Sequence, residues 1–172
     1  MKNSGLQRTW IRILLTVLTA AVMAAIFVFS MEPAEQSDET SGMIARQVIG
    51  VLYPDYDFYT EREQQTVYDS VQLAVRKTAH YTEYAVLGFL LRLTLGSWFG
   101  KRRWLTPAAW AIGTIYAGSD EFHQLLIDGR SGQWTDVLLD STGVLSGVLT
   151  AILVLFLIRK RIRRKEAKAA CP

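Results

Sequence analysis

The sequence contains a single cysteine, Cys171, among its 172 residues. One thiol cannot form an intrachain disulfide or a cysteine metal cluster, so redox chemistry is not supported. Internal repeats and low-complexity tracts are also absent. Residues 13–29 lack charge altogether, and residues 137–158 contain only Asp140. Each run is long enough to cross the roughly 30 Å hydrocarbon core of a membrane, so we expect two transmembrane helices.

Two further apolar segments are weaker candidates for membrane spans. Residues 84–99 contain Arg92, which we expect to extend toward an interface marked by Trp98. Residues 107–122 end in two acids, and the alternative for each segment is a helix of a soluble core. The sequence thus predicts four transmembrane helices, at residues 11–30, 78–99, 105–125 and 135–158.

Basic residues lie at alternate ends of these spans. They precede the first span, occupy residues 101–103, and fill a tail at residues 159–172. Positive charge is retained on the cytoplasmic side, so we expect both termini inside the cell and a tail attracted to anionic lipid, with no nucleic-acid partner. Residues 31–75 carry nine acids against two arginines, as expected of an exterior loop. The predicted fold is an all-α integral membrane bundle, N-in/C-in, forming one domain over residues 1–172.

The exterior segment at residues 31–77 has helical patterns of its own. Residues 43–52 place apolar side chains on one helical face, as in segments that lie in the headgroup layer. Thr60 and Glu63 match a capping box, which predicts a second helix that runs into the span at 78–99. A cleaved signal peptide is the alternative interpretation of the first span, although its apolar core is longer than usual.

Three clusters of polar and ionisable side chains lie at the edges of the apolar segments. Such residues at membrane depth are costly and are therefore candidates for function. A chain that alternates across the membrane brings all three clusters to its exterior side. The expected pocket consists of Lys77, His80, Glu83, Tyr84, Asp120, Glu121, Gln124, Arg130, Asp136 and Asp140.

These residue types suit chemistry on a phosphate. Lys77 and Arg130 provide positive charge, with arginine as a bidentate fork. His80 exchanges a proton near neutral pH, and Asp120 beside Glu121 is suited to act as a general acid or base. We therefore expect His80, Asp120 and Glu121 to carry any catalytic step. The expected ligand-binding residues are Lys77, Glu83, Tyr84, Gln124, Arg130, Asp136 and Asp140.

Two alternatives assign these side chains other roles. A metal site is conceivable, but the pattern does not match a known metal motif, so no metal or cofactor is expected. Its ligands would be His80, Glu83, Asp120 and His123. The second alternative is purely structural ion pairing, between Asp140 and Lys77 or between Asp120 and Arg130.

The segments RKTAHYTEYAVLGFLL (76–91) and SDEFHQLLIDGRSGQWTDVLLDSTGVLSG (119–147) resemble the VanZ-like membrane proteins, a family named after a component of teicoplanin resistance clusters. The stretch FSMEPAEQSDETSG (29–42) is similar to the family's signature after its first span, with Glu32 where glutamine is expected. The family has aspartate or asparagine at the position of Asp140. The resemblance implies a bacterial cytoplasmic-membrane protein of the cell envelope, with an effect on glycopeptide resistance.

The leading hypothesis is that the pocket binds an anionic membrane lipid or a lipid-linked cell-wall precursor. One alternative is a membrane enzyme that acts on a lipid phosphate. A small carrier, which would require a homodimer, and a structural partner of another envelope protein are further alternatives.

Overall fold

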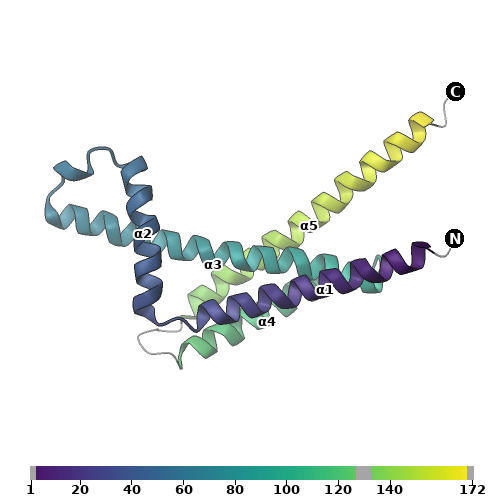
Figure 1. Cartoon of the computed structure of the whole chain (residues 1–172), viewed down its shortest axis with the longest axis horizontal. Coiled ribbons are helices and arrows are strands. Elements are labelled where there is room, and N and C mark those ends of the chain that lie inside the picture. The colour runs from purple at the N-terminus through teal and green to yellow at the C-terminus, as the bar shows by residue number, and fades with distance from the viewer. Residues whose placement is uncertain (1–2, 127–132, 170–172) are drawn as a thin grey trace.

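The structure is a computed structural model that describes residues 3–126 and 133–169. Within these ranges the chain is entirely helical, with no strand, so the predicted all-α class is confirmed. Figure 1 shows the arrangement. The elements are α1 (Asn3–Ser30), α2 (Ala34–Leu52), the short 3-10 helix η1 (Tyr56–Phe58), α3 (Glu61–Phe99), α4 (Leu105–Gln124) and α5 (Trp134–Ala169).

The longest helix, α3, contains both the second predicted span and the exterior helix before it. It begins at the predicted capping box: the Glu63 amide donates to Thr60 Oγ1, and the Thr60 amide donates to Glu63 Oε2 at 2.9 Å. It ends at Phe99, and the residue that caps it, Gly100, has a positive φ of 73° that suits glycine. Its 39 residues extend about 58 Å, well beyond the hydrocarbon thickness. The expected continuity of the helix that starts at the capping box with the segment at residues 78–99 is confirmed.

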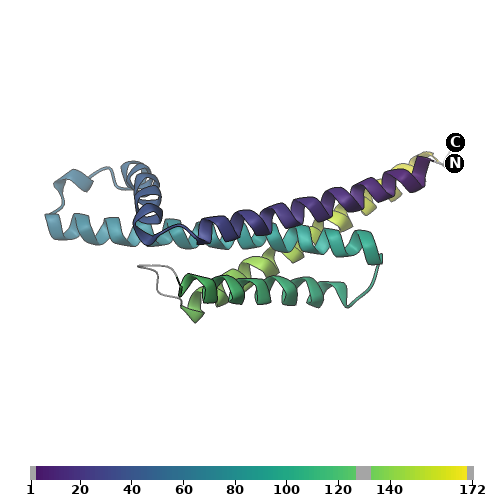
Figure 2. The ribbon, with the colours of Figure 1, turned by 60° about the horizontal axis from the view of Figure 1, so that its bottom comes forward.

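Four helices form the bundle, and α2 stands across one end of it. In both views α1 and α3 run side by side, with α4 beside them and α5 crossing them obliquely (Figures 1 and 2). The first part of α3 projects past the bundle at the α2 end. We refer below to this as the α2 end, and to the opposite end, which holds the start of α1 and the last part of α5, as the basic end.

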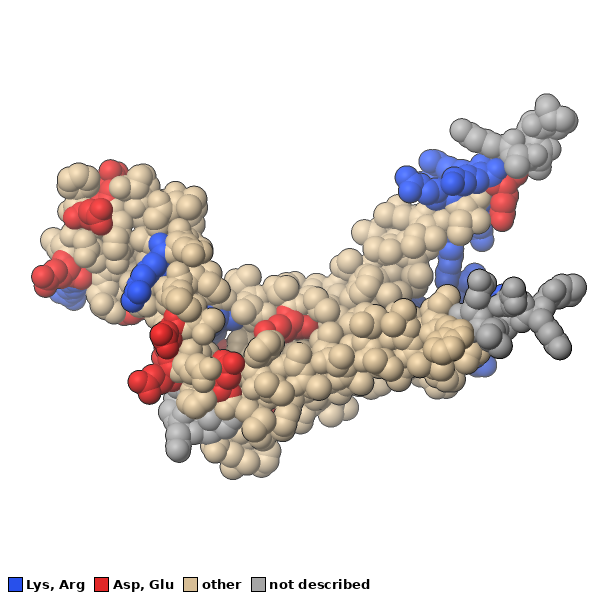
Figure 3. Space-filling model, viewed as in Figure 1, with Lys and Arg blue, Asp and Glu red and all other residues tan. Residues whose placement is uncertain are grey.

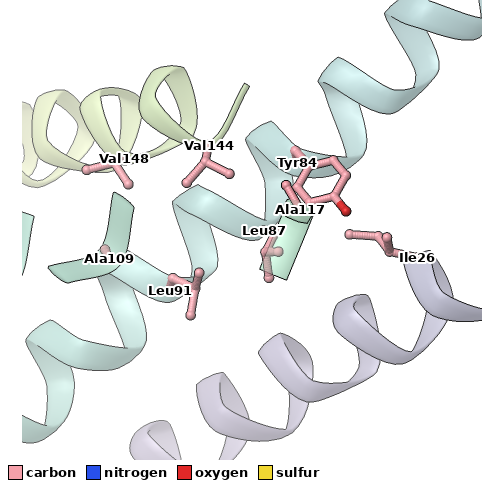
Figure 4. Close-up of a cluster of buried hydrophobic side chains, with 8 residues drawn as sticks. All are labelled: Ile26, Tyr84, Leu87, Leu91, Ala109, Ala117, Val144 and Val148. Carbon is pink, nitrogen blue, oxygen red and sulfur yellow. The ribbon is translucent and has the colours of Figure 1, made fainter. Parts of the chain in front are cut away.

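The core lies where α3, α4 and α5 meet, with Ile26 added from α1, and Figure 4 shows its eight buried side chains. Small residues allow α5 to approach α3 closely. A Cβ atom on Gly88, Gly143 or Gly147 would overlap backbone atoms of the facing helix. Close contact of this kind stabilises helix pairs where no hydrophobic effect drives association. Gly143 and Gly147 of α5 therefore serve packing within the chain.

Hydrogen bonds attach α1 to the rest of the bundle. Thr19 and Thr94 share a hydroxyl–hydroxyl hydrogen bond of 2.8 Å, and the Tyr116 hydroxyl donates to the Met23 carbonyl at 2.6 Å. Near the basic end, Arg12 Nε donates to the carbonyl of Ser97 at 2.9 Å. These bonds make α1 part of the bundle.

In the described part of the chain, two helical segments are long and apolar enough to cross a membrane, Arg8–Ser30 and Trp134–Ala167. They correspond to the first and fourth predicted spans. The four-span topology and the orientation stay predictions. The basic tail predicted at 159–172 continues α5 as helix to Ala169.

Candidate functional site

The polar clusters of α3, α4 and α5 meet at the α2 end of the bundle. Tyr84 on α3 is fully buried, and Asp120 on α4 and Asp140 on α5 are 3% and 2% exposed. Gln124 is buried one turn after Asp120 and donates its amide to Asp120 Oδ2 at 3.2 Å. Three helices thus place acidic and amide groups together in an otherwise apolar interior.

This cluster is short of hydrogen-bond donors. Among the described residues, Asp120 Oδ1 and Asp140 Oδ1 have no hydrogen-bond partner, although both atoms are buried. The buried Tyr84 hydroxyl lies close to the Asp120 carboxylate. A buried polar atom without a partner costs about 1–3 kcal/mol, so such groups call for an explanation. Asp140 also lies within electrostatic range of Asp120, Glu121, Asp136 and Glu83. The site is therefore richer in acids than in bases.

A pocket of about 260 Å³ opens beside Asp120. His80 and Glu83 from α3 line it with Asp120, and Arg76 adds a positive charge. Apolar side chains form the other part of the wall and come from three helices: Ile26 and Phe29 on α1, Ile44 on α2, and Val75 and Ala79 on α3. The pocket thus has a polar face and an apolar face.

The junction of α1 and α2 supplies a wall that the sequence analysis did not assign to the site. Ser30, Glu32, Ser37 and Ser41 line the pocket from this side. An ion pair of 2.8 Å between Arg76 Nη1 and Asp38 Oδ1 holds α2 against α3. A signal was present in the sequence, because the stretch 29–42 contains all of these junction residues and is one of the segments that carry the family resemblance.

Lys77 lies outside the pocket lining and pairs with Asp136. The distance from Lys77 Nζ to Asp136 Oδ1 is 3.3 Å, and both side chains are more than a third exposed. The structural alternative that paired Lys77 with Asp140 is wrong about the partner: the lysine reaches the acid one turn nearer the start of α5. Lys77 therefore connects α3 to α5 at the rim of the cluster.

Glu121 and Asp120 face different neighbours. Glu121 Oε1 accepts a hydrogen bond from the backbone amide of Gln133, just before α5. That bond fixes the start of α5 against the end of α4, while Asp120 lines the pocket. Arg130, predicted to bind phosphate, lies outside the described residues, and so does its proposed pairing with Asp120.

His123 packs against Phe27 of α1, with ring centroids 4.8 Å apart, and is not part of the pocket lining. The metal alternative grouped His123 with His80, Glu83 and Asp120. In the part of the chain that the structure describes, no three histidine, cysteine, aspartate or glutamate side chains are arranged to hold a metal ion.

Two described helices that are long and apolar enough to cross a membrane, with a buried polar cluster at one end of the bundle, suggest a helical membrane protein. The family model VanZ/LLP1 matches residues 15–157. The chain belongs to this family, and the resemblance found in its sequence is confirmed. Comparisons with curated proteins and with solved structures gave no match.

Proposed function

We propose that this VanZ-like protein binds the headgroup of an anionic lipid or a lipid-linked cell-wall precursor in the pocket at its α2 end. In this proposal the chain crosses the bacterial cytoplasmic membrane four times, with both termini inside, and the pocket opens to the outer leaflet. The observation that carries the proposal is the pocket's two-faced lining. Its apolar wall suits the start of an acyl or prenyl chain, and its charged wall suits a polar headgroup.

The charge distribution supports the proposed orientation. Figure 3 shows acidic side chains gathered at the α2 end and basic side chains at the opposite end. Positive charge is retained in the cytoplasm, which favours the basic end inside and the pocket outside. The hydrogen bonds from α1 to α3 and α4 favour α1 as a retained span over a cleaved leader.

The pocket's size and charges limit the ligand. About 260 Å³ lies just below the roughly 300–1,000 Å³ typical of small-molecule sites, so the pocket suits a headgroup fragment rather than a whole precursor. Among the described residues, Arg76 is the lysine or arginine in its lining, and Glu83 and Asp120 are acceptors. A phosphate next to sugar hydroxyls suits both kinds of group. Arg76, whose Nη1 pairs with Asp38, would bind the phosphate through its other N–H donors, and the acids would accept from the hydroxyls. Lys77 and Arg130 would add positive charge at the rim.

A native mass spectrum of the intact protein, extracted from its membrane, tests this proposal. We expect the wild type to retain a phosphate-bearing lipid, and the double variant Glu83→Gln, Asp120→Asn to retain much less of it. The variant should also abolish any effect of the protein on teicoplanin susceptibility in cells. The matched control is Glu61→Gln, an exposed acid at the start of α3. A folded double variant with unchanged lipid and unchanged susceptibility would contradict the proposal.

An enzyme that acts on a lipid phosphate is the second candidate. The observation that favours it is the buried Asp120 Oδ1 without a partner in a pocket that also contains His80. In this scheme Asp120 or Glu121 would act as general acid or base, and His80 would relay a proton. Purified protein should then convert a labelled polyprenyl phosphate. If wild-type protein that retains the lipid formed no product over time at any pH tested, the enzyme candidate would be rejected and binding would remain as the proposed function.

The remaining alternatives need a second protein surface. A carrier requires a homodimer, and a structural role requires another envelope protein. Gly143 and Gly147 already pack against α3, so either partner would have to use a different helix face. Crosslinking in the membrane distinguishes these assemblies from a monomer.

A further inference from the structure

A second cavity lies at the basic end, remote from the polar pocket. It has a volume of about 990 Å³ and is bounded by α1, α3, α5 and the connection from α3 to α4. Figure 3 shows basic side chains between the diverging ends of α1 and α5. Among the described residues, the lining includes six basic side chains and no acid. These are Arg8, Arg92, Lys101, Arg102, Arg103 and Arg159.

Arg92 is the most confined of these cations. Its Nε atom is buried and has no hydrogen-bond partner in the described part of the chain. Gly96, one turn later on α3, leaves the space that the guanidinium occupies, since a Cβ there would lie 3.0 Å from Arg92 Nη1. Its electrostatic neighbour is another cation, Arg159 of α5. Two arginines from facing helices therefore point their charge into one groove.

Arg12, at the same end of the bundle, is an arginine whose guanidinium has partners within the protein. Its Nε donates to the Ser97 carbonyl at 2.9 Å, and its guanidinium lies over the Trp98 ring, 5.5 Å from the centroid. None of the six groove cations forms an ion pair with a described residue. The contrast indicates that the groove cations lack an anion, whereas Arg12 is bound within the fold.

The groove also has an apolar wall. Leu15 of α1 and Ile152, Leu155 and Phe156 of α5 line the part that lies toward the middle of the bundle. Positive charge at the helix ends with apolar surface behind it matches a phospholipid, whose phosphate lies at the interface and whose acyl chains extend into the hydrocarbon. Basic pockets between membrane helices bind anionic headgroups in this way. A soluble phosphate would use only the charged part.

We propose that this groove is a binding site for an anionic phospholipid, whose phosphate is held by Arg92 and Arg159 and whose acyl chains lie against α1 and α5. Guanidinium groups suit this role because they bind phosphate oxygens through paired N–H donors. The site differs from the general attraction of a basic tail to anionic membranes. It is built on α3 and requires specific side chains, and it is independent of the ligand of the α2-end pocket.

Native mass spectrometry of the full-length protein, titrated in detergent with phosphatidylglycerol or phosphatidylcholine, tests the proposal. We expect one phosphatidylglycerol to bind much more tightly than phosphatidylcholine. Arg92→Gln should weaken phosphatidylglycerol binding about 10-fold to 100-fold, the range expected for a charge-assisted contact. Arg92→Lys, which keeps the charge and loses the fork, should give an intermediate loss.

The matched control is Arg163→Gln, which removes one charge from an exposed position on α5 outside the groove lining. We expect it to leave the affinity nearly unchanged. Equal losses in Arg92→Gln and Arg163→Gln would show nonspecific attraction by the tail and overturn the proposal. Displacement of the lipid by equimolar glycerol phosphate would assign the groove to a soluble phosphate instead. Size-exclusion profiles verify folding. If Arg92→Gln does not fold, Arg159→Gln, at an exposed position in the groove lining, provides the same test.

Discussion

At the α2 end of the bundle, acidic side chains are buried between helices, whereas at the basic end cations surround an open groove. Asp120 and Asp140 are almost inaccessible, and each has a carboxylate oxygen without a described partner. At the opposite end, Lys101, Arg102 and Arg159 are exposed. Burial strengthens electrostatic interactions and makes an uncompensated charge costly. The buried acids therefore need a nearby protein group, a bound proton or a ligand, whereas water solvates most of the cations.

The same contrast explains why the two ends call for different ligands. The α2-end pocket combines acids with Arg76 and His80, so it favours a headgroup that carries both negative charge and hydroxyl donors. The basic groove contains six cations without an acid, so it favours phosphate charge alone. The crossing of α3 and α5 connects the two ends, and a change there should affect both.

The largest effect is expected from Gly147→Ala at that crossing. The added Cβ would overlap the backbone of Ala85, so α5 must move away from α3. We expect a loss of about 1–3 kcal/mol in the free energy of unfolding, with lipid retention weakened at both ends. Thermal unfolding in detergent measures the first effect, and native mass spectrometry the second.

Gly50→Ala is the matched control, because the space around Gly50 on α2 is open. In a helix interior this change should stabilise the protein by about 0.5–1 kcal/mol. If Gly147→Ala were equally stabilising, α3 and α5 would not be in the close contact described here.

A smaller effect of opposite sign is expected from Asp140→Asn. The change keeps the shape and removes one negative charge from a cluster that includes Asp120, Glu83 and Glu121. A charge that is buried among other acids carries a cost of desolvation and repulsion, so its removal should raise the free energy of unfolding by about 1 kcal/mol. Asp69→Asn, at an exposed site on α3, should change it by no more than about 0.5 kcal/mol. A clear loss of stability in Asp140→Asn would mean that its carboxylate has a cation as partner in the native protein.

The ion pair of Lys77 and Asp136 should contribute still less. Both side chains are well exposed, and pairs of this kind typically contribute about 0.2–1 kcal/mol. A double-mutant cycle with Lys77→Met and Asp136→Asn, followed by chemical denaturation, measures the coupling. A coupling energy within that range together with unchanged lipid retention would assign Lys77 to bracing the bundle. Loss of the bound lipid in Lys77→Met would instead assign Lys77 to ligand binding.

The helices followed from the sequence because their signals are local. An uncharged run predicts α1, and the Thr60–Glu63 capping box fixes the start of α3. A chain that alternates across a membrane was also predicted to bring the polar clusters of three helices together. Tyr84, Asp120 and Asp140 do lie close to one another.

Contacts that depend on how α2 packs could not be predicted. Nothing local to Arg76 indicates that it pairs with Asp38, 38 residues away, and that contact places the α1–α2 junction over the pocket. Partner choice within one turn, such as Lys77 with Asp136 rather than Asp140, depends on the crossing of α3 and α5. Helical periodicity gives the face of a residue but not the register between helices.

The smallest effect concerns Glu63, an acid at the α2 end whose carboxylate accepts hydrogen bonds from Thr60. Hydrogen bonds from the Thr60 hydroxyl and amide lower the pKa of the fully exposed Glu63 carboxyl below its ordinary value of 4.5. A pKa that is lower in the folded state contributes stability above 4.5, and that contribution is lost as the pH falls through the lowered value. We therefore expect amide protection in the first turn of α3 to weaken below about pH 4.5, after correction for intrinsic exchange rates. Glu63→Gln should remove this pH dependence, and Glu61→Gln should retain it. If the dependence survived in Glu63→Gln, a different acid would control the projecting end of α3, in contrast to the buried acids, for which loss of charge should stabilise the fold.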